Sequence, residues 1–166
     1  MPAEATDTSD PIADPALLPH WLILGRATLP GQPAYVREAR RLVAGAVGGG
    51  HPRADTAILL TSELVTNAVT HSRSQRPDGT VDLMVATSIY GLLVAVTDDG
   101  SDAGGPVIRS SPGAESGNGL LLVQTLADGW GFRHSRGRTM VWFRLCSKEQ
   151  PTRALSPSFA DAWNAA

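Results

Sequence analysis

Two polar residues with the chemistry of a metal or phosphate site stand one helical turn apart. Glu63 and Asn67 are four residues apart in a segment where Leu60 and Leu64 recur at helical spacing, so both polar side chains lie on one face of a helix expected over 52–71. A sheltered carboxylate needs a partner. A hydrated magnesium ion carrying phosphates is such a partner, because magnesium prefers oxygen ligands and few protein contacts. The simpler alternative is an exposed Glu/Asn pair on a helix surface.

Two carboxylates end an apolar segment at Asp98 and Asp99, just before Gly100. Alternation along the strand expected over 92–97 puts Asp98 on the face that packs against helices and Asp99 on the other face. A carboxylate in the first position can accept a hydrogen bond from an exocyclic amine such as that of adenine. An ordinary Asp-Asp-Gly turn is the alternative.

A third feature is the run Gly117, Asn118 and Gly119, immediately before a short apolar helix expected to begin at Leu120. Glycines allow a backbone to approach a phosphate closely, and a helix N-terminus presents free N–H groups and a positive dipole end. The alternative is a flexible connection. Thr139 begins the last expected strand, where its small hydroxyl could support a purine.

Two cationic side chains are further candidates. His71 lies four residues beyond Asn67 on the same helix face, where it could approach a phosphate or instead cap the C-terminal end of the helix. Arg109 lies in a segment rich in Gly, Pro and Ser, where it could reach a terminal phosphate or remain solvated. That segment, 101–116, is predicted to be a lid over the site.

The segments that position these residues show either the apolar spacing of a helix or the alternation of a strand. The pattern predicts strand, helix, helix, strand, strand, lid, helix, strand and strand, over 21–29, 33–47, 52–71, 80–87, 92–97, 101–116, 120–127, 130–135 and 139–145. This order predicts an α+β two-layer sandwich, a mostly antiparallel mixed sheet with helices on one face. Residues 1–19 and 148–166 are predicted to be polar tails that flank one domain over 20–147.

Composition narrows the classes of function. The formal net charge of −2 gives no reason to expect direct binding to nucleic acid or to an anionic membrane. Cys146 is the only cysteine, which excludes an internal disulfide and a cysteine-based metal cluster. No apolar run approaches the ~20 residues of a membrane span, and the N-terminus lacks a signal pattern. We therefore expect a cytoplasmic protein.

The order and spacing of the four motifs resemble the ATP site shared by gyrase, heat-shock chaperones, histidine kinases and MutL, the GHKL superfamily. The asparagine box matches Glu63 and Asn67, the two glycine boxes match 98–100 and 117–119, and the threonine near the adenine matches Thr139. The resemblance covers about residues 21–146. It implies a Bergerat fold that binds ATP with Mg²⁺.

The resemblance also implies a role for each matched residue. Asn67 would coordinate magnesium, and Asp98, followed by Gly100, would hold the adenine amine. The backbone from Gly117 to Leu120 would cradle the phosphates. Glu63 would orient or deprotonate the attacking hydroxyl.

Within this superfamily, the stretches SELVTNAV over 62–69 and GLLLV over 119–123 resemble the anti-sigma-factor serine kinases. That branch implies an anti-sigma factor that phosphorylates an anti-sigma-factor antagonist on serine or threonine, with a sigma factor as second partner and a possible homodimer. One departure is Asp102, which stands where the first glycine box ordinarily ends in glycine. Glu63 favours a kinase, whereas Asp102 favours a non-catalytic ATP sensor. The ATPase piece of a larger assembly is a third alternative.

Overall fold

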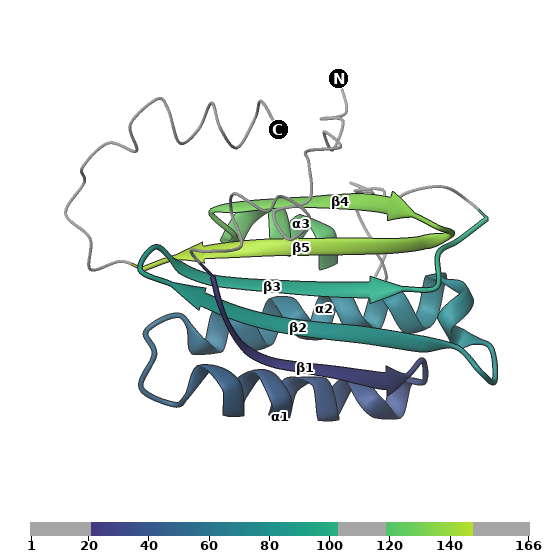
Figure 1. Cartoon of the computed structure of the whole chain (residues 1–166), viewed down its shortest axis with the longest axis horizontal. Helices are drawn as coiled ribbons and strands as arrows, with labels where there is room; N and C mark the ends of the chain where they lie inside the picture. Colours follow the sequence, from purple (N-terminus) through teal and green to yellow (C-terminus); the bar gives the residue numbers. More distant parts are fainter. Residues whose placement is uncertain (1–20, 103–118, 148–166) are drawn as a thin grey trace, which may run out of the picture.

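The computed structural model describes residues 21–102 and 119–147 of the chain. Figure 1 shows the strands and helices within these ranges. In chain order they are β1 (Leu22–Pro30), the 3₁₀ turn η2 (Pro33–Tyr35), α1 (Val36–Val47), α2 (Ala54–His71), the 3₁₀ turn η3 (Arg73–Gln75), β2 (Thr80–Ser88), β3 (Gly91–Asp98), α3 (Gly119–Leu126), β4 (Gly129–Ser135) and β5 (Arg138–Cys146).

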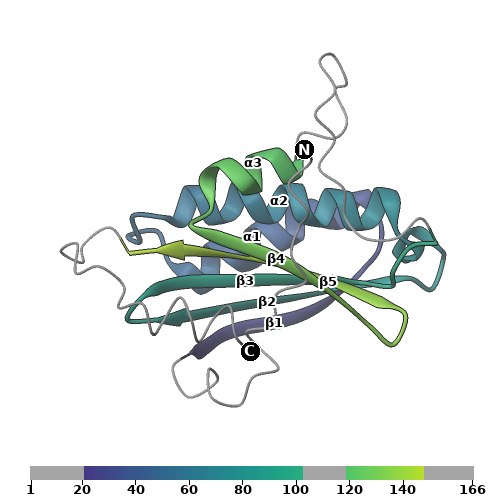
Figure 2. The same cartoon turned by 90° about the horizontal axis from the view of Figure 1, so that it is seen from above.

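The strands form one sheet in the order β1-β2-β3-β5-β4. Each of the four pairings between these strands is antiparallel, so no mixed pairing occurs among the described strands. The three α-helices lie together on one face of the sheet (Figure 2). The predicted α+β two-layer fold is therefore confirmed, and each predicted helix and strand in the described ranges is present with ends shifted by a few residues.

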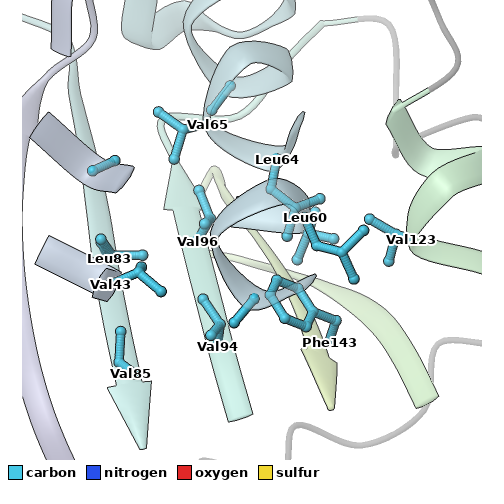
Figure 3. Packing of buried hydrophobic residues seen from close by; sticks show 14 of the residues in the cluster. Val43, Leu60, Leu64, Val65, Leu83, Val85, Val94, Val96, Val123 and Phe143 are labelled. Atoms are coloured by element: carbon cyan, nitrogen blue, oxygen red, sulfur yellow. The ribbon is translucent and has the colours of Figure 1, made fainter. Parts of the chain in front are cut away.

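The main core lies between the helices and the sheet (Figure 3). The predicted alternation on β2 is confirmed, because Val81, Leu83 and Val85 are buried there. From the helix layer, Leu60 of α2 and Val123 of α3 are fully buried against the same cluster. Burial of this apolar face, rather than local helix preference alone, fixes α2 on the sheet.

A second, smaller cluster of buried residues occupies alternate positions of the central strands: Ala86, Leu93, Ala95 and Trp142. These positions alternate with the core positions and so lie on the sheet face opposite the helices. The strands β3 and β5 are thus buried on both faces. This is why 91–96 is apolar throughout instead of alternating.

None of the described helices is long and apolar enough to cross a bilayer. The predicted tails lie outside the described residues. So does most of the predicted lid, of which only Ser101 and Asp102 are described.

Candidate functional site

Glu63 and Asn67 of α2 face the first residue of α3. A methyl group on Gly119 would place its carbon 2.8 Å from the Glu63 Oε2 and 3.2 Å from the Asn67 Nδ2. A real Cβ does not approach another atom as closely as the first of these distances, so a side chain at position 119 would require the end of the Glu63 side chain to move. The helix that bears Glu63 and Asn67 therefore meets Gly119, the last residue of the second glycine box.

Both side chains are half-buried. Within 21–102 and 119–147, no hydrogen bond or ion pair holds the Glu63 carboxylate or the Asn67 amide, whereas the neighbouring Thr61 and Thr66 hydroxyls donate to carbonyl oxygens one turn back in α2. A half-buried carboxylate is stabilised by a polar partner. The two groups are therefore free to accept a ligand that brings cations or hydrogen-bond donors.

Asp98 ends β3 on the helix-facing side of the sheet, as alternation predicts. Its Oδ1 accepts a hydrogen bond of 2.7 Å from the Gly100 N–H, inside a turn in which Gly100 has φ +76°. Burial raises the pKa of the Asp98 carboxyl, the charge of Asp99 adds to this, and the Gly100 hydrogen bond and two nearby cationic groups offset part of it. One oxygen of Asp98 is thus fixed by the turn, and the desolvation of the carboxyl outweighs the groups that favour its ionised form.

Thr139 of β5 lies directly opposite Asp98 in the sheet register and is buried. Its Oγ1 is 2.9 Å from the Nδ1 of His134, which lies opposite Thr139 on β4. Asp98, Thr139 and His134 therefore form a polar row across three strands at the end of the apolar core. His134 is not among the site residues predicted from the sequence. A two-residue turn at Arg136 and Gly137 places His134 opposite Thr139, so the hairpin register indicates this contact.

Asp99 points away from this row, as predicted, and has a structural role. Its Oδ2 accepts the Thr80 N–H at 2.8 Å and its Oδ1 pairs with the Arg138 Nε at 3.3 Å. Arg138 also reaches Asp82 of β2 at 2.6 Å. Burial acts to raise the pKa of Asp82, but hydrogen bonds from Thr28 and Arg138 outweigh it and hold that pKa below its ordinary value. These groups brace β2, β3 and β5 behind Asp98.

The second glycine box is described only in part. α3 begins at Gly119, one residue earlier than expected, so Gly119 and Leu120 form the helix N-terminus beside Glu63 and Asn67. Gly117, Asn118 and Arg109 lie outside the described residues. The free N–H groups of a helix N-terminus next to an amide and a carboxylate suit an anion that carries a divalent cation, so the described residues fit a magnesium–phosphate group.

His71 stays in the last turn of α2 with an exposed side chain, which makes no hydrogen bond or ion pair within the described ranges. The residue that ends the helix is Ser72, in extended conformation, and its hydroxyl donates to the Ala68 carbonyl oxygen at 2.7 Å. His71 thus lies where a basic side chain can interact with the helix dipole, whereas the side-chain hydrogen bond at the helix end is made by Ser72. His71 lies four residues after Asn67, one turn further along α2.

Asp102 is not a free charge at the end of the first glycine box. Its Oδ1 accepts a hydrogen bond of 2.8 Å from the Nη1 of Arg73, which follows α2. The sequence indicates that Asp102 departs from the family pattern, but it does not indicate that Arg73 is the partner of Asp102.

The chain has the architecture of a GHKL-type ATPase domain. It is a two-layer α+β domain in which the helix that bears Glu63 and Asn67 meets the N-terminus of a second helix. Asp98 and Thr139 lie on adjacent strands. The family model of the histidine kinase-like ATPase domain matches residues 29–145, and the chain belongs to this family. Domains of this kind bind ATP, generally with magnesium. No match to the chain was found among curated proteins.

Proposed function

We propose that the chain is an ATP-dependent protein serine/threonine kinase that also acts as an anti-sigma factor in the cytoplasm. Its substrate is a small anti-sigma-factor antagonist domain, and a sigma factor is its second partner. The observation that carries the proposal is the pair Glu63 and Asn67, half-buried against Gly119 and held by no other described residue. A chain that only bound nucleotide would need the asparagine but not the carboxylate.

The residues divide the work of binding and positioning. Asn67 would hold the magnesium ion, Asp98 the adenine amine, and the N-terminus of α3 the phosphates. ATP supplies the phosphoryl group when bound. Phosphoryl transfer needs positioning, charge neutralisation and a group that accepts the hydroxyl proton, and Glu63, one turn from Asn67, would accept that proton.

The competing proposal is a non-catalytic ATP sensor that controls a protein partner. Asp102 is the observation in its favour, because a carboxylate replaces the usual glycine there. However, its charge is directed to Arg73 at 2.8 Å, which lessens its conflict with a bound polyphosphate.

A phosphotransfer assay tests the proposal. The full chain is incubated with labelled ATP, magnesium and candidate antagonist domains from the same genome, each beside a version whose candidate serine or threonine is replaced by alanine. We expect label on one antagonist and none on its alanine version. A chain that binds ATP well and labels no candidate would overturn the kinase in favour of the sensor.

A further inference from the structure

Arg73 belongs to none of the predicted motifs, yet it joins three parts of the site. It is the first residue of η3, directly after α2. Its Nε donates to the Asp99 carbonyl oxygen at 3.0 Å and its Nη2 donates to the Gly137 carbonyl oxygen at 2.8 Å. Its own backbone N–H donates to the Gly100 carbonyl oxygen at 2.7 Å. One residue therefore links the end of α2 to the end of β3 and to the β4–β5 turn.

The two turns joined by Arg73 lie in direct contact. A methyl group on Gly100 would place its carbon 2.2 Å from the Gly137 carbonyl oxygen and 2.9 Å from the Arg73 Nη2. Both glycines have positive φ, +76° at Gly100 and +78° at Gly137. Arg136 beside Gly137 also has positive φ, +51°, which gives this hairpin a tight two-residue turn. The Arg73 guanidinium stabilises this contact by donating to a carbonyl oxygen of each turn.

Each linked segment carries one residue of the candidate site. Asn67 of α2 lies six residues before Arg73, Asp98 ends β3 directly before Asp99, and Thr139 follows Gly137 by two residues. The planar guanidinium donates in fixed directions, so it holds the two carbonyl oxygens at a set separation, which a flexible ammonium does not do. The spacing between Asp98 and Thr139 is thereby fixed at the end of their strands.

The remaining contact of Arg73 is with Asp102. Three carboxylates, those of Asp98, Asp99 and Asp102, fall within five residues. Asp99 is paired with Arg138 and Asp102 with Arg73, so that Asp98 is the carboxylate left for a ligand. Asp102 is 81% exposed, so this ion pair adds little to stability by itself. Its effect is to compensate a negative charge beside the site.

We propose that Arg73 is a positioning residue of the nucleotide site. It holds the Gly100 turn against the Gly137 turn, so that Asp98 and Thr139 face the ligand together, and it compensates the charge of Asp102. The inference rests on the proposed ATP binding and adds to it a residue and an ion pair that act through others.

The test uses the full chain with Arg73→Ala, Arg73→Lys and the control Arg76→Ala, which removes an exposed arginine three residues later. Three quantities are measured for each: MgATP affinity by calorimetry, the thermal unfolding midpoint, and hydrogen exchange of the Gly100 amide without nucleotide. That amide donates to Asp98, so its exchange reports the geometry of the carboxylate. We expect Arg73→Ala to weaken MgATP binding by about tenfold or more and to speed exchange at Gly100, because small misplacements in a site are costly. We expect Arg76→Ala to match the wild type.

Arg73→Lys separates positioning from charge and guards against an unfolded alanine variant. Lysine keeps the charge opposite Asp102 but does not bridge two carbonyl oxygens in fixed directions. We expect fast Gly100 exchange and an affinity between those of Arg73→Ala and the wild type. Adding Asp102→Asn to Arg73→Ala should recover part of the MgATP affinity without slowing Gly100 exchange.

The positioning role is wrong if Arg73→Lys or Arg73→Ala leaves both MgATP affinity and Gly100 exchange at the level of Arg76→Ala. It is also wrong if Lys restores both completely, since charge alone would then suffice. If the wild type binds no ATP, the proposed function fails. Gly100 exchange in the nucleotide-free protein then still decides whether Arg73 fixes the Asp98 turn.

Discussion

Gly119, at the start of α3, packs so closely on Glu63 of α2 that a methyl group at Gly119 would place its carbon 2.8 Å from the Glu63 Oε2. The two residues are far apart in the sequence, and this approach turns a polar helix face into one wall of a site. Because the Asn67 Nδ2 lies 3.2 Å from the same position, any side chain at Gly119 would disturb both polar groups at once.

This contact predicts that one substitution has unequal effects at two glycines. Gly119→Ala should raise the free energy of unfolding by less than Gly45→Ala does, because the new methyl group must displace the end of the Glu63 side chain and lies 3.2 Å from the Glu63 Cβ. Gly45→Ala should raise it by about 0.5–1 kcal/mol, since Gly45 is exposed within α1 with nothing near its added methyl group and alanine favours helix. Urea titration of both variants is the measurement. An equal rise in the free energy of unfolding of both variants would show that Gly119 does not pack closely against Glu63.

Asn67→Ala should abolish magnesium-dependent ATP binding while leaving the fold intact, because the Asn67 amide makes no hydrogen bond to the described parts of the protein. The matched control is Thr66→Ala on the same helix. Thr66 is exposed and its hydroxyl only donates to the Ser62 carbonyl oxygen, so its loss should leave affinity unchanged. Calorimetry with and without magnesium compares the two. Wild-type affinity in Asn67→Ala would remove Asn67 from the metal site.

Asp98→Asn should weaken nucleotide binding by about 10–100-fold, the usual range for losing a hydrogen bond to a charged group. Burial raises the pKa of Asp98. The wild-type affinity should therefore fall as pH is lowered through that raised pKa, and the affinity of the Asn variant should not. Binding titrations from neutral to acid pH give this comparison.

The raised pKa of Asp98 also predicts how the free energy of unfolding of the ligand-free protein differs between the wild type and Asp98→Asn. A carboxyl whose pKa is raised in the folded state binds its proton more tightly there, so ionised Asp98 lowers stability at neutral pH, and Asp98→Asn should raise the free energy of unfolding. Asp82 has a lowered pKa, so its contribution is present above the ordinary pKa and is lost as pH falls through the lowered one. Asp82→Asn should therefore destabilise the protein at neutral pH without affecting nucleotide binding. Denaturation of both variants at neutral pH checks the signs, and a loss of stability in both would contradict the account of Asp98.

Glu63→Gln separates an enzyme from a sensor. Glutamine keeps the size of the side chain but removes its charge, so ATP affinity should stay within about tenfold of wild type while transfer to the antagonist falls by at least ~10²-fold, the usual contribution of a general base. Single-turnover transfer beside a binding titration measures both. Transfer at the wild-type rate would leave the protein a kinase but exclude Glu63 as its base.

We propose that a sigma factor would bind the surface of α1 on which Arg37 and Arg41 are exposed. Arg41 is 3.6 Å from Glu38, but the two side chains are 63% and 46% exposed, so this pair does little to neutralise the surface. Arg37→Glu with Arg41→Glu should abolish capture of an acidic sigma-factor partner and leave ATP affinity unchanged. The control is Arg26→Glu with Arg76→Glu, which changes the net charge equally at exposed sites elsewhere. Pull-down with purified sigma factors decides, and equal capture by both double variants would make the α1 arginines a solvated face only.

The sequence alone determined those parts of the site that depend on local periodicity. Helical spacing placed Glu63 and Asn67 on one face, and strand alternation placed Asp98 towards the helices and Asp99 away from them. Both rules hold within an element because neighbouring residues along it have fixed directions. The fold class followed from the order of these elements, since an apolar helix face and an apolar sheet face must be buried against each other.

The tertiary structure alone decided which elements meet. The approach of Gly119 to Glu63 and the contact of the Gly100 turn with the Gly137 turn both depend on packing and sheet register. The same holds for the ion pair of Asp102. The sequence shows Asp102 as a departure from the glycine-box pattern, but only the folded chain brings its carboxylate 2.8 Å from Arg73, a residue 29 positions earlier. Contacts across such separations are selected by the free energy of the whole packed chain, and no period in the sequence encodes them.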